Sequence, residues 1–334
     1  MLETIDPLLI SVLAVYSLVL VAAIMLGGKL PTMVKMTHTR TQLVMSFVSG
    51  LMLGIAIFHL LPHAIYTIAG DQAVEIAARW TMFGLLVMFL LLRVFHFHHH
   101  DMSEDAHDSQ CVEHAGDAHG GNSHAGHSHT NNDHSHHSHS ERSATQPASW
   151  MGIALGLTIH TMIDGVALAA SMQADWALFS GDNGLAMLVG FGVFLAILLH
   201  KPLDALTISS LMTDSGASKM KRQLVMFAFA IICPLSALAA LWGINVIAGG
   251  HGLYVGALLA FSAGVFLCIS LSDLLPEVHF HSHDRLKMTV VLLLGVGFAL
   301  ALVSIEPPHR HNFSDMVSSH HSDASHHESE QQKQ

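Results

Sequence analysis

Charged side chains are scarce in this sequence. Asp, Glu, Lys and Arg make up 12% of its 334 residues, about half the share in a typical soluble domain. Cysteine is also rare: Cys111, Cys233 and Cys268 are odd in number and far apart, which argues against a disulfide framework. The first apolar segment lacks the basic n-region and the small-residue cleavage site of a secretory signal, so we expect it to be retained.

The sequence is instead rich in apolar residues, which occur in long blocks. They account for 51% of the chain and run for about 20 residues or more at a time, which is the length of a helix that crosses a bilayer. We therefore expect an all-α integral membrane protein with eight spans, at about residues 7–28, 42–68, 74–95, 149–174, 184–212, 222–248, 252–279 and 286–305. The predicted domains are membrane helices over 1–95 and 149–305, a polar loop at 96–148 and a polar tail at 306–334.

The few basic residues predict the orientation of these spans. With the N-terminus outside, ten Lys and Arg residues lie at the cytosolic side, three lie outside and Lys201 lies within a span. This is a strong positive-inside signal, and it places both termini outside the cytosol. The compact outer loops favour a bacterial inner membrane. The ten cytosolic residues are Lys29, Lys35, Arg40, Arg93, Arg142, Lys219, Lys221, Arg222, Arg285 and Lys287.

The loop and the tail are rich in histidine. Residues 96–148 contain fourteen histidines and residues 307–334 contain six, among Ser, Asp, Glu and other polar residues. Neither segment has the apolar content for a core, so we expect both to be disordered. Neutral imidazole is a common metal ligand, which favours metal buffering or sensing over a plain polar linker. The candidate ligands of the loop are His98, His99, His100, His127, His129, His134, His136, His137 and His139.

The fourth and fifth spans share a histidine and an aspartate four residues apart. The fourth reads HTMIDGVAL, with His160 and Asp164, and the fifth reads HKPLDALTI, with His200 and Asp204. Residues at this spacing lie on one face of a helix, one turn apart. Two such faces turned toward each other would present two imidazoles and two carboxylates. That set suits Zn²⁺ and, with less preference, Fe²⁺, Mn²⁺ or Cd²⁺.

The cost of burying charge supports this interpretation. Each ionisable side chain at the bilayer centre costs roughly 2.5–3.5 kcal/mol, so Asp164, Lys201 and Asp204 are expected to face a polar interior. A structural ion pair between Lys201 and Asp204, at i and i+3, is the alternative. It would leave His160 and the repeated His-x-x-x-Asp unexplained.

The second and seventh spans also resemble each other. GLMLGIAIFHLLPHAI (50–65) aligns with GVFLCISLSDLLPEVH (264–279), so His59 and His63 correspond to Asp273 and Glu277. On the predicted topology these two spans run in opposite directions, which makes the repeat inverted, as in many transporters. We expect these four residues at the entrance and exit of a metal pathway. Solvated helix-end residues are the alternative.

Together these motifs resemble the ZIP (Zrt/Irt-like protein) family of divalent-metal transporters. The resemblance covers the whole membrane part, and HKPLD resembles the subgroup with His-Lys on the fifth span. It implies a 3+2+3 arrangement in which spans 1–3 repeat as spans 6–8, a homodimer, and zinc uptake into the cytosol by alternating access. It further implies that the central helices slide against a scaffold of the second, third, seventh and eighth spans. Many members carry a carboxylate where this chain has Lys201, so we predict that this ammonium replaces a second metal and leaves one transported-ion site.

Three other functions fit the sequence less well. A cation-diffusion exporter usually has six spans and a folded cytosolic C-terminal domain, whereas the tail here is too polar to fold. An intramembrane zinc hydrolase would need a general base and an open water position, and the chain has no H-E-x-x-H. A metal-sensing scaffold would not need buried His/Asp faces. We therefore expect a transporter and not an enzyme, with metal ions, lipid and a second copy as partners and no nucleic acid.

Overall fold

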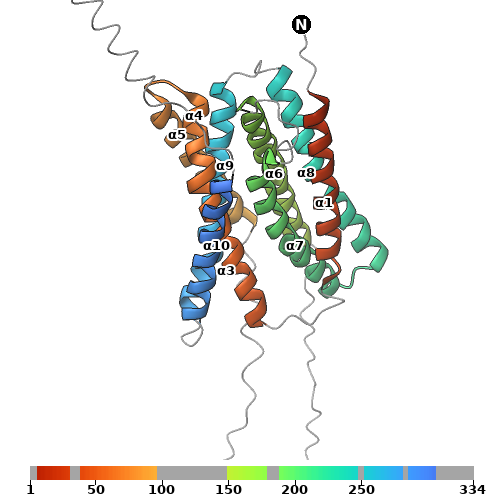
Figure 1. Ribbon diagram of the computed structural model, residues 1–334. Helices are drawn as coiled ribbons and strands as arrows, with labels where there is room; N and C mark the ends of the chain where they lie inside the picture. Colours follow the sequence, from red (N-terminus) through yellow and green to blue (C-terminus); the bar gives the residue numbers. More distant parts are fainter. Residues whose placement is uncertain are drawn as a thin grey trace, which may run out of the picture.

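The computed structural model describes residues 6–30, 38–95, 149–178, 188–246, 252–280 and 285–305, and its regular structure there is helical (Figure 1). Within these residues, eight stretches are long and apolar enough to cross a membrane, which confirms the predicted all-α membrane class. The elements are α1 (Pro7–Gly27), α3 (His38–Ile55), the π-helix η1 (Ala56–Leu60), α4 (Leu61–Ile68), α5 (Ala73–Phe95), α6 (Ser149–Leu178), α7 (Phe191–Asp214), α8 (Lys219–Val246), α9 (Gly252–Phe280) and α10 (Arg285–Ile305).

Several span ends differ from the sequence prediction by a few residues, and the second and fifth spans also differ in their local backbone structure. The fifth begins at Phe191 and not at 184, because Val189 and Gly190 form a turn and Gly190 has a φ of +70°. A left-handed residue cannot continue a right-handed helix, so the helix starts after it. The second span, predicted as one helix, contains the π-turn η1, where the Leu61 N–H bonds to the Ala56 carbonyl five residues back. Pro62 follows this turn and has no N–H to give to the preceding turn.

The helices form two groups. The first, here named the α9 bundle, contains α3, η1, α4, α5, α9 and α10; the second, named the α6 bundle, contains α1, α6, α7 and α8 (Figure 1). The most extensive pairings are α3 with α10, α5 with α9, α6 with α8 and α4 with α9, followed by α1 with α7. Glycine permits these close approaches: a Cβ on Gly264 would lie 1.9 Å from the Thr81 carbonyl oxygen of α5. Small residues serve this purpose in membrane helices generally.

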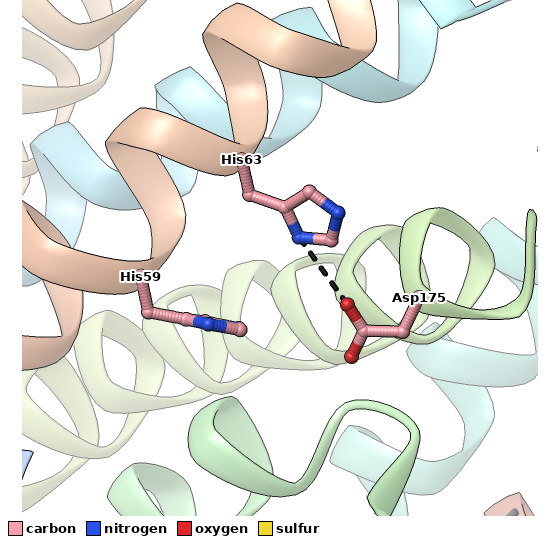
Figure 2. A group of neighbouring side chains, drawn as sticks. All are labelled: His59, His63 and Asp175. Atoms are coloured by element: carbon pink, nitrogen blue, oxygen red, sulfur yellow. Dashed lines mark ion pairs between the residues drawn. The ribbon is translucent and has the colours of Figure 1, made fainter. Parts of the chain in front are cut away.

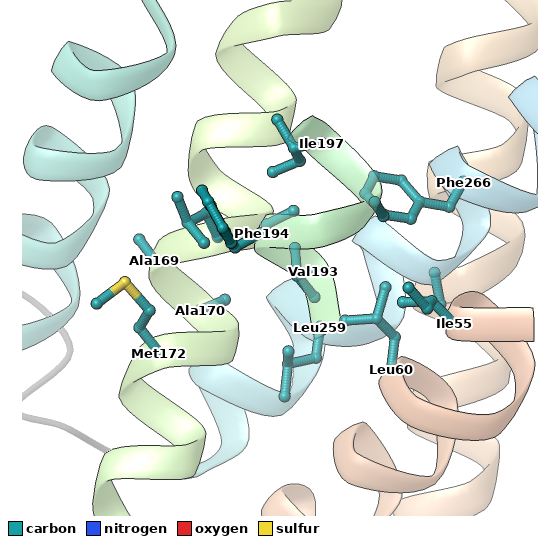
Figure 3. Close-up of a cluster of buried hydrophobic side chains, with 14 of the residues drawn as sticks. Ile55, Leu60, Ala169, Ala170, Met172, Val193, Phe194, Ile197, Leu259 and Phe266 are labelled. Atoms are coloured by element: carbon teal, nitrogen blue, oxygen red, sulfur yellow. The ribbon is translucent and has the colours of Figure 1, made fainter. Parts of the chain in front are cut away.

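Apolar side chains fill the contact between the two bundles (Figure 3). Ile55, Leu60, Leu259 and Phe266 from the α9 bundle meet residues of α6 and α7, and all four are fully buried. The α6 and α7 residues in this contact, named with the other four the apolar barrier, are Ala169, Ala170, Met172, Val193, Phe194 and Ile197. The barrier occupies the stretch of α6 just beyond Asp164.

Candidate metal centre

The predicted histidines and aspartates of the fourth and fifth spans come together. His160 and Asp164 lie on α6, and His200 and Asp204 lie on α7. Asp164 Oδ2 is 3.4 Å from Nε2 of both His160 and His200, and His160 Nε2 is 3.8 Å from Asp204 Oδ2. One ligand atom from each of His160, His200 and Asp204 lies within 4.8 Å of the other two. With Lys201, these residues are named the central cluster.

Lys201 provides the positive charge of the central cluster. Its side chain is fully buried, and Nζ lies 2.6 Å from Asp164 Oδ2 and 2.9 Å from Asp204 Oδ2. The ammonium also donates a hydrogen bond to Thr161 Oγ1 at 3.0 Å. The i, i+3 ion pair considered from the sequence is therefore present, but a second carboxylate from the neighbouring helix shares the same ammonium. Two carboxylates and one ammonium leave a net charge of −1 beside the two imidazoles.

The surroundings orient the imidazoles. His200 Nδ1 lies 2.8 Å from the Ala196 carbonyl oxygen. Because a carbonyl only accepts, Nδ1 donates this hydrogen bond, as in many metal-binding histidines, and Nε2 faces Asp164 Oδ2 at 3.4 Å. The His200 ring also packs edge-on against Phe266 of α9 at 6.3 Å between centroids, so the cluster borders the α9 bundle.

Two polar atoms of the central cluster remain without a hydrogen bond. His160 Nδ1 and Asp164 Oδ1 are buried and have no hydrogen-bond partner among the described residues. Buried polar atoms are nearly always paired, so orphans of this kind mark places where an ion or water completes the set. This donor set, with nitrogen and oxygen ligands and no sulfur, fits a divalent transition metal.

A small apolar hollow adjoins His160. It is lined by residues of α5 and α6, namely Met88, Leu91, Leu92, Ile153, Gly156, Leu157 and His160. These residues belong to the halves of α5 and α6 that the predicted orientation places at the cytosolic side. The hollow and the apolar barrier thus lie on opposite sides of the central cluster along α6.

A second group of ligands lies near the far end of α6 (Figure 2). His59 of η1 and His63 of α4 are buried and meet Asp175 of α6, with His63 Nδ1 3.2 Å from Asp175 Oδ1. One ligand atom from each of the three lies within 4.8 Å of the others. They are named the end cluster. At 1.5 Å per residue, Asp175 lies about 16 Å along α6 from Asp164.

The sequence had grouped His59 and His63 with Asp273 and Glu277 as pathway residues. Asp273 and Glu277 lie on the last turns of α9, where side chains are outside the described residues. The histidines of the loop, from His98 to His139, also lie outside them. Asp175 was missed because the fourth span was ended at 174. An acidic residue beside Trp176, at the end of an apolar helix, was the available signal.

Comparison with known proteins finds a family model that covers the whole membrane part and relatives that match a little under half of the chain. A family model described as "ZIP Zinc transporter" matches residues 8–303. Zinc transporter ZIP9-B of Xenopus laevis is 28% identical over 173 residues, which is 48% of this chain and 54% of the relative. Zinc transporter ZIP9 of Micropogonias undulatus is 28% identical over 147 residues, covering 43% of this chain and 44% of the relative. The chain thus spans about half the length of these relatives.

Proposed function

Because the chain belongs to the ZIP zinc transporter family, we propose that it carries divalent metal ions, zinc first among them, across a membrane into the cytosol. The observation that carries the proposal is the convergence of His160, His200 and Asp204, with Asp164 beside them, inside the membrane spans. This family consists of transporters and not of enzymes, which agrees with the sequence interpretation. Fe²⁺, Mn²⁺ and Cd²⁺ are the further ions that the donor set accepts.

Lys201 tunes the affinity of this site in the proposal. Its ammonium bridges Asp164 and Asp204, so an arriving metal has to displace it or share the carboxylates with it. A net charge of −1 attracts a divalent ion less than the −2 of the two carboxylates alone would. We therefore propose a single-ion site with fast release, in which the ammonium returns to the carboxylates once the ion has left.

Alternating access would arise from movement of the α6 bundle against the α9 bundle. The packing supports the inverted repeat on which such movement rests, because exchanging spans 1–3 with spans 6–8 turns the α3–α10 pairing into the α9–α5 pairing. Exchanging span 4 with span 5 in the same operation turns the α1–α7 pairing into the α8–α6 pairing. The apolar barrier separates the central cluster from the end cluster, whereas the hollow at His160 adjoins the opposite side. The position of the barrier favours a conformation turned toward the cytosol.

Orientation and assembly complete the proposal. Both termini face away from the cytosol, as the positive-inside rule requires, and two copies associate as a homodimer. The relatives found come from vertebrates and give no support to the bacterial inner membrane favoured by the sequence. Accessibility of single cysteines placed before α1 and after α10 to an impermeant reagent tests the orientation.

Zinc uptake into proteoliposomes tests the transport site. We expect saturable uptake by the wild-type protein and uptake reduced to background by His200→Ala and Asp204→Ala, because each removes a ligand. Deletion of residues 98–145 should leave the maximal rate intact, since we propose that the loop buffers metal and does not conduct it. Glu75→Gln, at an exposed carboxylate, is the matched control. Equal flux in all variants would contradict the site.

A further inference from the structure

The end cluster joins residues of both bundles at one point. His59 and His63 belong to the α9 bundle and Asp175 belongs to the α6 bundle (Figure 2). The side chains of His59 and His63 are buried, and that of Asp175 is 15% exposed. A ligand set at the boundary where we propose that the two bundles move against each other would act on that movement.

Local backbone structure places the two histidines side by side. The π-turn η1 adds a residue to the turn before Pro62, and the rings of His59 and His63 stand 5.7 Å apart between centroids. Short π-turns inside α-helices occur often at functional sites, where they redirect one side chain. Thr67 donates a hydrogen bond to the His63 carbonyl oxygen at 2.7 Å, which supports the helix turn that carries His63.

The backbone of the α7 entrance holds the carboxylate. Gly190 N–H donates to Asp175 Oδ2 at 2.6 Å, which leaves Oδ1 facing His63. Gly190 also starts α7, the helix that carries His200 and Lys201. Asp175 therefore connects three places at once: the end of α6, the start of α7 and, through its second oxygen, α4.

The composition of the cluster is that of an open zinc site. Two imidazoles and one carboxylate form a three-ligand set that Zn²⁺ uses with a fourth position left for water. Ligand atoms around a tetrahedral zinc are about 3.4 Å apart, given bond lengths near 2.0–2.1 Å. The three atoms here lie within 4.8 Å, so side-chain shifts of about 1 Å would close the site around an ion.

We propose that His59, His63 and Asp175 form a second divalent-metal site, and that an ion bound there bridges α4 to α6 and holds the two bundles in the present conformation. The bridging role rests on the proposed movement between bundles; the binding itself does not. Zinc that accumulates at this end would then slow its own transport. An ion pair between His63 and Asp175 without metal binding is the competing explanation.

Hydrogen–deuterium exchange of the full chain in nanodiscs tests the binding, because it resolves the end cluster from the histidine-rich loop. We expect Zn²⁺ to slow exchange in peptides that cover 59–70 and 173–178. Asp175→Asn and His63→Gln should raise the zinc concentration for half-maximal protection by about 100-fold or more, because loss of a ligand should cost at least as much as the roughly 10–100-fold that loss of a ligand's hydrogen-bond partner costs. Asp175→Asn keeps an oxygen that can accept from Gly190, so the helix connection survives. Asp71→Asn, an exposed carboxylate at the same end, is the matched control.

The outcomes separate this proposal from the transport site. His200→Ala should abolish zinc protection of peptides around 197–206 and leave protection at 59–70 unchanged. Absence of zinc protection at 59–70 in the wild-type protein, while 197–206 is protected, would overturn the second site alone. Protection at 59–70 without any at 197–206 would overturn the transport site alone.

Uptake kinetics test the bridging role. We expect wild-type uptake to rise and then fall as external zinc increases, and Asp175→Asn uptake to rise to a plateau. A wild-type rate that only saturates, with binding at 59–70 demonstrated, would show that the ion does not hold the bundles.

Discussion

The central cluster and the end cluster contain the same two ligand types but neutralise their carboxylates differently. In the central cluster an ammonium, Lys201 Nζ, lies within 3 Å of both Asp164 and Asp204. In the end cluster a backbone N–H, from Gly190, holds one oxygen of Asp175. In the central cluster a metal ion has to displace the Lys201 ammonium, which favours weak binding and rapid release. In the end cluster the Gly190 N–H holds only Oδ2 of Asp175 and leaves Oδ1 available to a metal ion, which favours retention of the ion. The comparison predicts that one site passes ions and the other keeps them.

Lys201→Met should have the largest effect on this comparison. Removing one partner from a buried ion-pair network costs about 3–5 kcal/mol, because two carboxylates then share no cation. We expect a lower Tm in EDTA and a much larger gain in Tm with Zn²⁺ than the wild-type protein shows. Thermal unfolding with and without zinc measures both. Lys219→Met, at an exposed lysine, is the control. If zinc stabilised both proteins equally, the ammonium would not compete with metal.

Gly165→Ala should disturb the central cluster and spare the end cluster. A Cβ at Gly165 would lie 1.9 Å from Ser236 Oγ and 2.6 Å from the Cys233 carbonyl oxygen, so α6 and α8 would have to separate. Overpacking of this kind costs about 1–3 kcal/mol. We expect a lower uptake rate with unchanged zinc protection at 59–70. Gly152→Ala on the same helix meets nothing within 4 Å and should behave as the wild type does.

Thr161→Val should weaken the hold on Lys201 without removing its charge. The hydroxyl accepts from Lys201 Nζ and donates to the Leu157 carbonyl oxygen at 2.7 Å. Two carboxylate partners remain, so the loss should be about 1 kcal/mol. We expect slightly tighter zinc binding, because the ammonium is easier to displace. Titration followed by exchange in 197–206 measures this, and Thr207→Val is the control, since its hydroxyl bonds only within α7. Weaker binding would contradict the reasoning.

Glu75→Gln should have the smallest effect. Its ion pair with Arg79 lies within one turn of α5, and both side chains are more than half exposed. Exposed pairs contribute within about 1 kcal/mol. We expect Tm, uptake and zinc protection to match the wild type within error. A marked loss in Tm, uptake or zinc protection would contradict the premise that only buried charges, such as those of the two clusters, affect stability and metal binding.

Periodicity and composition predicted most of the fold and the face of each helix on which the His and Asp side chains of α6 and α7 lie. Eight apolar blocks and the His-x-x-x-Asp spacing are properties of single helices, so His160, Asp164, His200 and Asp204 could be assigned before any packing was known. The ion pair between Lys201 and Asp164 could not be predicted from the sequence, because it depends on how α6 and α7 cross. Likewise the sequence paired Lys201 only with Asp204, its neighbour on the same helix.

For the end cluster, the sequence identified two of the ligands but not the third residue that contacts them. Its two histidines were chosen from an internal repeat, which pointed to Asp273 and Glu277 as their counterparts. Their spatial neighbour is Asp175, from a helix outside the repeat, and its contact depends on the left-handed Gly190 turn and the position where α6 ends. Turn geometry and helix ends are the features that hydropathy blocks determine least.

The π-turn at Ala56–Leu60 also sets which face the second half of this span presents. Each residue of an α-helix turns the chain by about 100°, so if the same residues were wound as a regular α-helix, everything after this turn would be rotated by about that angle. His63 would then point away from α6 while the apolar content of the span stayed the same. Chains that match this one in every hydrophobic block, but wind this segment as a regular α-helix, would cross the membrane equally well and present a different face to Asp175.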